Sequence, residues 1–169
     1  MDRLLLTLLV VAFFGLCVLG MWRGWRRQAR AQSVEFAPFP EVPADPGTPV
    51  LPAMRGVYVC STRAGHWQQR IVTRGAGVRS AATLCLYPEG VEVRREGAPE
   101  FWIPRESVVD AKLARGMAGK VLGTDSLLVI TWRLAGTDID TGFRGDGTDS
   151  YPQWIDALGA GTVEKGSQE

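Results

Sequence analysis

The longest uninterrupted apolar run lies near the amino end, at residues 4–21, and contains neither charge nor proline. A helix over these 18 residues would be roughly 27 Å long, at about 1.5 Å per residue, close to the hydrocarbon thickness of a bilayer. The pattern therefore predicts one membrane-spanning helix, and we assign residues 1–30 to a transmembrane anchor.

Basic residues gather on one side of this run. Only Arg3, opposed by Asp2, precedes it. The flank that follows it comprises Trp22, Arg23, Arg26, Arg27 and Arg30. Because basic flanks stay preferentially on the cytoplasmic side, the asymmetry predicts a single-pass protein of the plasma membrane with a cytoplasmic carboxyl-terminal part. The arginines and the tryptophan are typical of headgroup contact at the membrane interface.

A cleaved secretory signal is the competing interpretation of the same run. Ala29-Arg30-Ala31 has the pattern of a signal-peptide cleavage site. The run is longer than the usual signal core, and arginines stand between it and the candidate site, as in a stop-transfer sequence. These two features favour the anchor.

Proline dominates the next segment, residues 31–53, which holds six of the ten prolines of the chain. Each proline ring fixes φ near −65° and pushes the preceding residue toward extended geometry. The composition predicts a semi-rigid linker without helix that holds a domain away from the membrane. Two P-x-x-P matches leave open a second interpretation, a ligand for SH3-type modules, although no arginine flanks them.

Short apolar runs broken by glycine and proline follow, and they are typical of strands. Alternation is clearest where Leu128, Ile130, Trp132 and Leu134 share one face, and Val109, Ala111 and Leu113 alternate with polar residues. Turn sequences at 88–90 and 135–137 predict two hairpins. Seven strands are predicted, at 56–61, 82–87, 91–95, 101–103, 109–113, 127–134 and 139–143.

The apolar period then changes from two to that of a helix. Tyr151, Trp154, Ile155 and Leu158 recur at helical spacing after Ser150, a candidate cap, and the helix is expected to end near 159–161. Residues 54–161 therefore form the predicted folded domain, and residues 162–169 a disordered tail.

Strands followed by one terminal helix resemble the pleckstrin-homology-like (PH-like) fold. More narrowly, the chain resembles a family of single-pass actinobacterial membrane proteins with a PH-like domain. The resemblance rests on the membrane run with its arginine stop, the proline-rich segment, residues 56–62, 84–93 and 101–107, and Trp154. It implies a mainly β barrel or sandwich of about seven strands, in two near-orthogonal sheets, with one carboxyl-terminal helix. It also implies a membrane-tethered, non-enzymatic module.

The largest local charge bias of the domain follows the first strand, since no carboxylate occurs between Asp45 and Glu89. The PH-like resemblance implies that basic residues here contact anionic lipid headgroups or phosphate. The candidate contacts are Arg63, Arg70, Arg74 and Arg79. The alternative is a solvated basic face, because the paired basic spacing typical of lipid-binding PH domains is missing.

No pattern in the chain indicates catalysis, a cofactor or a metal site. Cys60 and His66 lack a third orienting group, Gly119-Lys120 lacks the remainder of a phosphate loop, and no glutamate closes a calcium loop after Asp138. Cys60 and Cys85 are expected to be buried free thiols. The net charge of +1 indicates no partner class, and we expect no nucleic-acid partner.

The leading hypothesis is a membrane-anchored cytoplasmic interaction module. Its expected partners are the lipid bilayer, anionic headgroups of the inner leaflet and an unidentified protein that it recruits. The alternative is an accessory subunit of a membrane transport or export assembly, in which the apolar helix packs against other membrane helices.

Overall fold

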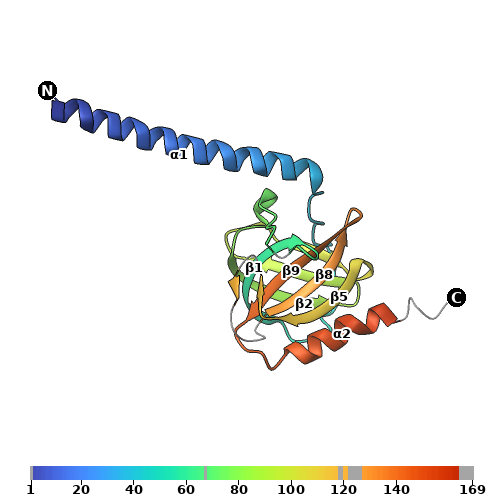
Figure 1. Cartoon of the computed structure of the whole chain (residues 1–169). Coiled ribbons are helices and arrows are strands. Elements are labelled where there is room, and N and C mark those ends of the chain that lie inside the picture. The colour runs from blue at the N-terminus through green and yellow to red at the C-terminus, as the bar shows by residue number, and fades with distance from the viewer. Residues whose placement is uncertain (1, 67, 118–119, 122–126, 164–169) are drawn as a thin grey trace.

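The computed structural model describes residues 2–66, 68–117, 120–121 and 127–163. An amino-terminal helix projects from a β-rich body that carries a second helix at its carboxyl end (Figure 1). The elements are α1 (Asp2–Glu35), β1 (Met54–Arg63), η1 (Thr73–Gly75), β2 (Ser80–Tyr87), β3 (Gly90–Arg95), β4 (Phe101–Pro104), η2 (Arg105–Ser107), β5 (Val108–Ala114), β6 (Gly116–Met117), β7 (Lys120–Val121), β8 (Leu127–Leu134), β9 (Thr137–Gly145) and α2 (Tyr151–Val163).

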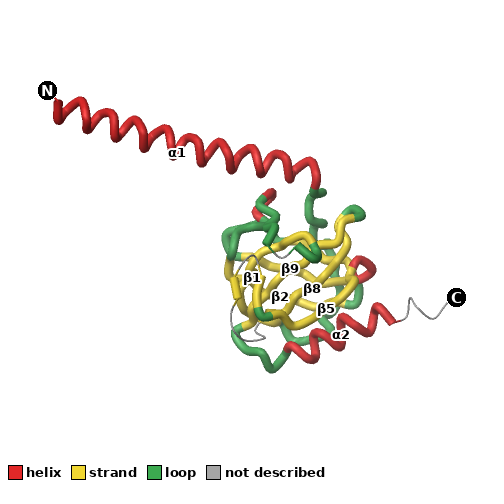
Figure 2. The backbone as a smooth tube through the Cα atoms, viewed as in Figure 1, coloured by secondary structure: helices red, strands yellow, loops and turns green. Residues whose placement is uncertain are grey.

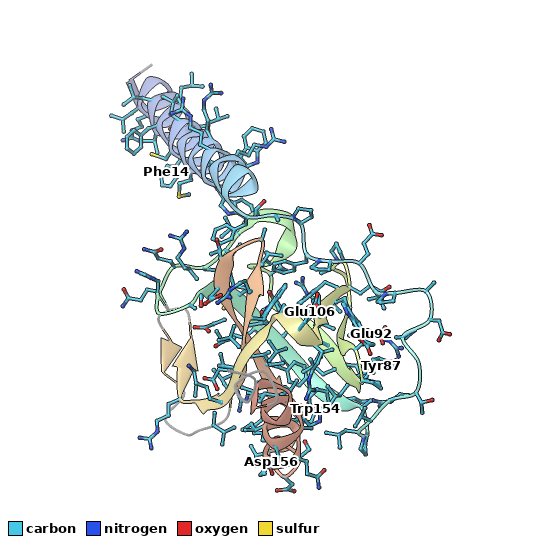
Figure 3. All side chains as sticks on the ribbon, turned by 90° about the vertical axis from the view of Figure 1, so that its right-hand side faces the viewer. Phe14, Tyr87, Glu92, Glu106, Trp154 and Asp156 are labelled. Atoms are coloured by element: carbon cyan, nitrogen blue, oxygen red, sulfur yellow. The ribbon has the colours of Figure 1, made fainter. Side chains whose placement is uncertain are left out.

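Helix α1 contains a segment, Leu6–Arg27, that is long and apolar enough to cross a membrane. All side chains of this segment are exposed, and Phe14 stands clear of the domain (Figure 3). The helix continues to Glu35, so the prediction that residues 31–53 contain no helix is wrong for its first five residues. The prolines begin only at Pro38, and nothing before them interrupts helical hydrogen bonding.

Seven antiparallel strands form one hydrogen-bonded sheet in the order β4-β3-β2-β1-β9-β8-β5, and they curl around a common interior (Figure 2). This confirms the mainly β class and the seven predicted strands. The resemblance implied two sheets, whereas here the ten-residue β1 belongs to both halves. Its amino-terminal part pairs with β2 and β9, and after a bulge between Tyr58 and Cys60 it pairs with β9 alone. A bulge bends a strand, so one strand serves both halves.

The inward face of β8 and the carboxyl-terminal helix fill the core as predicted. Leu128, Ile130, Trp132 and Leu134 all belong to the main buried cluster. Helix α2 packs against β5 and contributes Tyr151, Trp154 and Leu158 to the same cluster. Figure 3 shows Trp154 turned toward the sheet and Asp156 turned away from it. The helix runs to Val163, slightly beyond its predicted end.

Strand β5 departs from the predicted face. Val109 and Leu113 are each 41% exposed, whereas Val108 and Ala111 are buried. A register shift between Val108 and Asp110 in the pairing with β8 explains the difference, because an extra residue at a bulge interrupts the alternation of faces.

The proline-rich segment packs on the domain, contrary to its prediction as a free linker. We call residues 36–53 the strap. Phe36 is buried, and the ring of Phe39 lies 4.7 Å from that of Phe101 and 5.6 Å from that of Trp132, measured between centroids. The strap contributes its Pro40 carbonyl, which accepts a hydrogen bond from the Trp102 N–H.

The apolar residues between the prolines explain this outcome. Val42 packs on the outer side of the sheet, Leu51 packs against the main cluster, and the Val50 N–H donates to the Leu86 carbonyl. A chain stiffened by prolines loses little conformational entropy when it is ordered, so few apolar contacts suffice to hold it. The domain therefore begins at Phe36, directly after α1, and not at residue 54.

Replacing the Phe39 ring tests how firmly the strap is held. In the full chain in lipid nanodiscs, Phe39→Ala is expected to lower the free energy of unfolding by about 2–3 kcal/mol, because it leaves a cavity between two aromatic rings. Urea unfolding followed by tryptophan fluorescence measures the change. Val50→Ala, at an exposed strap position, is the matched control and should change stability by less than about 0.5 kcal/mol. Equal stability of both variants would mean that the strap is not part of the folded domain.

Candidate functional site

The basic segment lies in the connection between β1 and β2, at the end of the domain that meets α1. Within this connection, η1 contacts α1 and lies beside its last turns (Figure 1). If Leu6–Arg27 crosses a bilayer, these residues are the part of the domain nearest to it. We call residues 64–79 the basic loop.

The four predicted arginines are not equivalent. The Arg63 guanidinium carbon lies 5.9 Å from the Phe36 ring centroid, so Arg63 contacts the strap. Arg70 is half-buried and donates to the Gly77 carbonyl at 3.3 Å, which ties the two ends of the loop together. Arg74 belongs to η1, but its side chain lies outside the described part of the structure. Arg79 is exposed next to the 51% exposed Val78.

Arg95 of β3 fixes the shape of the basic loop. Its Nη2 donates to the Gly75 carbonyl at 2.9 Å and to the Val78 carbonyl at 2.7 Å, and its Nε donates to the Ser80 hydroxyl at 3.2 Å. The guanidinium lies 4.1 Å from the centroid of the Tyr58 ring. Burial lowers the pKa of Arg95, and the side chain still carries its charge at neutral pH because the ordinary value is so high.

Tyr58 is a second buried side chain that hydrogen-bonds the basic loop. Its hydroxyl donates to the Ala76 carbonyl at 2.6 Å and lies 2.9 Å from the Ser61 hydroxyl. Burial strongly raises the pKa of Tyr58, so the phenol keeps its proton and remains a donor. Arg95 and Tyr58 together hold the backbone carbonyls of Gly75, Ala76 and Val78, so this end of the loop is fixed next to Arg79.

The sequence analysis did not single out Arg95. A signal was present, because Val91, Val93 and Arg95 share one face of a predicted strand and that face is buried. A charged residue at an inward position needs polar partners, and backbone carbonyls of a loop can supply them. The pattern alone does not say which loop lies there.

The membrane flank has the exposure that its predicted role requires. Trp22, Arg23, Arg26 and Arg27 are all exposed, and the Arg26 guanidinium lies 4.2 Å from the Trp22 ring centroid. Arg30 also belongs to α1, but its side chain is outside the described part of the structure. Aromatic rings and guanidinium groups at this position suit the headgroup layer.

The two cysteines of the domain lie apart and are both buried free thiols, as predicted. Cys60 packs with Leu127 and Val129, and burial raises its pKa although Arg70 opposes the shift. Burial also raises the pKa of Cys85. His66 is exposed, and its Nδ1 lies 3.3 Å from the Ala64 carbonyl oxygen. A buried thiol with a raised pKa is a poor nucleophile.

Among the described residues, no three His, Cys, Asp or Glu side chains gather as a metal site would require. Asp138 and Asp140 serve other partners. Asp138 pairs with Arg133 at 2.7 Å, and Asp140 accepts from the Thr131 hydroxyl at 2.6 Å. Arg133 lowers the pKa of Asp138 through this contact. Both carboxylates are therefore engaged by side chains of the β8–β9 hairpin itself.

A strap, a curled seven-stranded sheet, a closing helix and a basic loop held by a buried arginine together define a small β-rich domain. Residues 36–159 match the family described as Bacterial PH domain-like, and the chain belongs to this family. The match begins at Phe36, which agrees with the strap being part of the domain. No curated protein matches the chain. The narrower actinobacterial resemblance stays a prediction.

Thiol reactivity tests the conclusion that Cys60 and Cys85 serve packing. In a Cys17→Ser variant in nanodiscs at about pH 8, a polar disulfide reagent should modify both thiols at least about a hundredfold more slowly than after unfolding in guanidinium. Reactivity should rise with pH more steeply than for a free thiol, because the raised pKa values keep the thiols protonated. Rapid labelling of Cys60 in the folded protein would contradict this assignment.

Proposed function

We propose that this chain is a membrane-anchored, non-enzymatic interaction module of the plasma membrane. The PH-like domain lies in the cytoplasm, the basic loop contacts anionic headgroups of the inner leaflet, and the oriented domain recruits a protein. The membrane-facing position of the basic loop carries this proposal. PH-like domains are generally non-catalytic interaction modules, and the buried thiols agree with that role.

Helix geometry supports contact between the loop and the leaflet. The eight residues after Arg27, up to Glu35, extend α1 by about 12 Å beyond the candidate span. The headgroup layer of one leaflet is about 5–8 Å thick. Because η1 contacts α1 beside its last turns, and Val78 and Arg79 follow η1 in the chain, a membrane-spanning α1 would hold the basic loop near the anionic surface, where charges act over a Debye length of about 8 Å.

The strap strengthens this proposal. A flexible tether would let the domain sample many orientations, and each contact with the leaflet would then cost rotational entropy. The strap joins α1 to the core through Phe36 and Phe39 with no free linker between them. The membrane helix therefore presents the basic loop to the leaflet in a restricted set of orientations.

Charge reversal in the basic loop tests leaflet contact. A Val78→Cys probe labelled with a polarity-sensitive dye, in the Cys17→Ser background, should emit at shorter wavelength in nanodiscs with about one-third anionic lipid than in phosphatidylcholine nanodiscs. Arg79→Glu should weaken this contact by about 2 kcal/mol, at about 1 kcal/mol per unit charge near the surface. Salt at about 0.5 M should also weaken this contact, because it screens the attraction between the arginine and the anionic lipid.

Arg55→Glu is the matched control, because Arg55 is an exposed arginine of the same domain near the other end of β1. It should leave the dye emission unchanged. Identical spectra in anionic and phosphatidylcholine nanodiscs would refute leaflet recognition and leave protein recruitment as the role of the module.

Topology reporters test the orientation and the retention of α1. Fusion of a fluorescent protein after Val163 should give fluorescent bacteria, and fusion of a periplasm-dependent phosphatase at the same position should be inactive, since basic flanks remain inside. Edman sequencing should find the chain uncut at Ala31. An active phosphatase, or a mature chain that begins at Gln32, would refute the cytoplasmic anchor.

A further inference from the structure

One region of the outer sheet face is left uncovered between two covered ones. The strap residue Val42 packs over Cys85, Tyr87 and Trp102, and a second buried cluster around Cys60 lies on the other side. Between them, a groove of about 640 Å³ runs over β1, β2 and β3. We call it the sheet groove, and its lining includes Arg55, Val57, Ala81, Thr83, Arg94 and Glu96.

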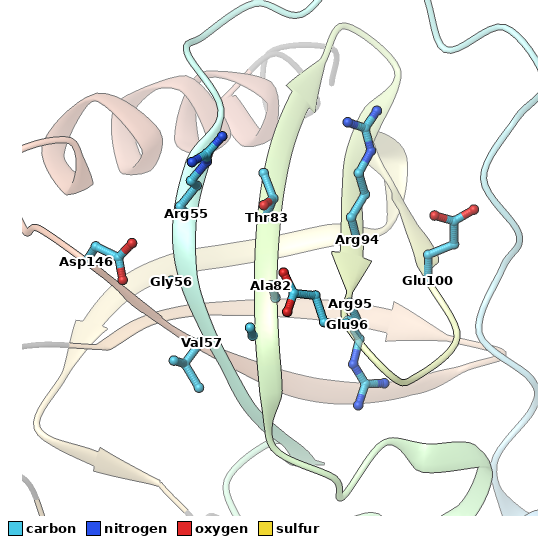
Figure 4. A pocket seen from close by; sticks show the side chains of 11 residues that line it. Arg55, Gly56, Val57, Ala82, Thr83, Arg94, Arg95, Glu96, Glu100 and Asp146 are labelled. Carbon is cyan, nitrogen blue, oxygen red and sulfur yellow. The ribbon is translucent and has the colours of Figure 1, made fainter.

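Strand register places the two exposed arginines in one row across the groove. Arg55 pairs with Thr83, and Thr83 pairs with Arg94. Figure 4 shows both arginine side chains extending from the same side of the sheet on either side of Thr83. The next row consists of Val57, Ala81 and Glu96, so small side chains form much of the floor.

A buried carboxylate positions Arg94. Glu92 is only 4% exposed, and it accepts hydrogen bonds from the Arg94 Nε at 2.7 Å and from the Tyr87 hydroxyl at 3.0 Å. Burying a carboxylate is costly unless it is paired in this way. The contact holds the guanidinium through Nε, and the Arg94 side chain is still 55% exposed, so it is accessible to an anionic ligand.

The spacing of the row fits two anionic groups better than one. Arg55 and Arg94 lie on strands separated by β2, so their backbones are about 10 Å apart. Figure 4 shows their side chains running side by side and not converging. In a polyproline-II segment, which has three residues per turn and rises about 3.1 Å per residue, carboxylates three residues apart lie on the same side and are separated by about 9 Å.

Two further observations restrict the ligand. Glu96, Glu100 and Asp146 also line the groove, so the lining carries charges of both signs and disfavours a dense polyanion such as nucleic acid more than a segment with two separated carboxylates. Arg55 is eight residues from Arg63, or roughly 26 Å along the strand, and therefore lies far from the basic loop that faces the membrane. A soluble partner fits this position better than a lipid headgroup.

We propose that the sheet groove binds a polyproline-II segment of a soluble partner protein that carries two carboxylates three residues apart, one contacting Arg55 and the other contacting Arg94, across Thr83. This inference deepens the recruitment part of the proposed function and rests on it. Glu92 already orients Arg94 in the unbound protein, so the site is preformed. The small floor residues let the partner backbone approach the sheet.

A designed peptide tests the proposal. The full chain in phosphatidylcholine nanodiscs is titrated with a fluorescent peptide of sequence Gly-Pro-Glu-Pro-Pro-Glu-Pro-Gly, in which proline favours the polyproline-II conformation, and anisotropy is recorded at low salt. Binding should be saturable, and Arg55→Gln and Arg94→Gln should each weaken it at least about fivefold. The matching peptide with Gln at both Glu positions should not bind. Arg79→Gln, in the basic loop, is the matched control and should bind as the unchanged chain does.

Glu92→Gln tests whether Glu92 acts by positioning the Arg94 guanidinium or only by stabilising the fold. It should weaken binding of the peptide in the presence of Arg94 and have no further effect in an Arg94→Gln background, because both changes remove the same contact. Additive losses would refute the positioning role of Glu92.

Three results would overturn the groove proposal: no peptide binding at millimolar concentration, equal binding of the Gln peptide, or binding of inorganic phosphate without binding of the peptide. Phosphatidylcholine carries no net charge, so these results do not depend on leaflet contact. If the peptide does not bind but the dye at position 78 still reports contact with anionic nanodiscs, the groove proposal is refuted and leaflet contact is not.

Discussion

The insertion of Phe36 and Phe39 into the domain core, directly after the last turn of α1, is the contact on which the arrangement of this molecule depends. Both rings come from the strap, and Phe39 packs against Phe101 and Trp132, which also stack on each other, at distances typical of favourable aromatic pairs. Because Phe36 directly follows α1 and is buried in the core, no free linker separates the candidate membrane helix from the domain. The position of each surface relative to α1 follows from that junction.

Two buried polar networks then shape the surfaces that the junction orients. Arg95 and Tyr58 hold the basic loop through backbone carbonyls, and Glu92 and Tyr87 hold Arg94 on the outer sheet face. Both networks contain a buried charged side chain whose hydrogen-bonding groups are engaged, which is the condition under which burial of a charge is tolerated. Each also presents an exposed element, a loop tip in one case and a guanidinium in the other.

These features divide the domain into the end next to α1 and a lateral face. The basic loop belongs to the end next to α1, and the sheet groove belongs to the face between the strap and the Cys60 cluster. An anchored module that uses both could contact lipid and a protein partner at once. Such a division lets leaflet contact orient the domain without occupying the recruitment surface.

The sequence by itself determined the apolar helix, the strands and the terminal helix, because these depend on periodicity that neighbouring residues express. The face of β8 and the buried side of α2 were predicted residue by residue. The charge bias after the first strand was visible in the sequence, whereas the headgroup role of its arginines is a prediction, and the sequence did not distinguish the exposed Arg79 from the half-buried Arg70.

Only the tertiary structure decided where the strap lies, which arginine organises the basic loop and which residues share the sheet groove. Proline content predicts stiffness but not a docking surface, and the aromatic partners of Phe39 are more than sixty residues away in the chain. The bulges in β1 and β5 likewise shift the strand faces without a local sequence signal. Local patterns specify elements, whereas contacts between distant residues are fixed only when the sheet closes around its core.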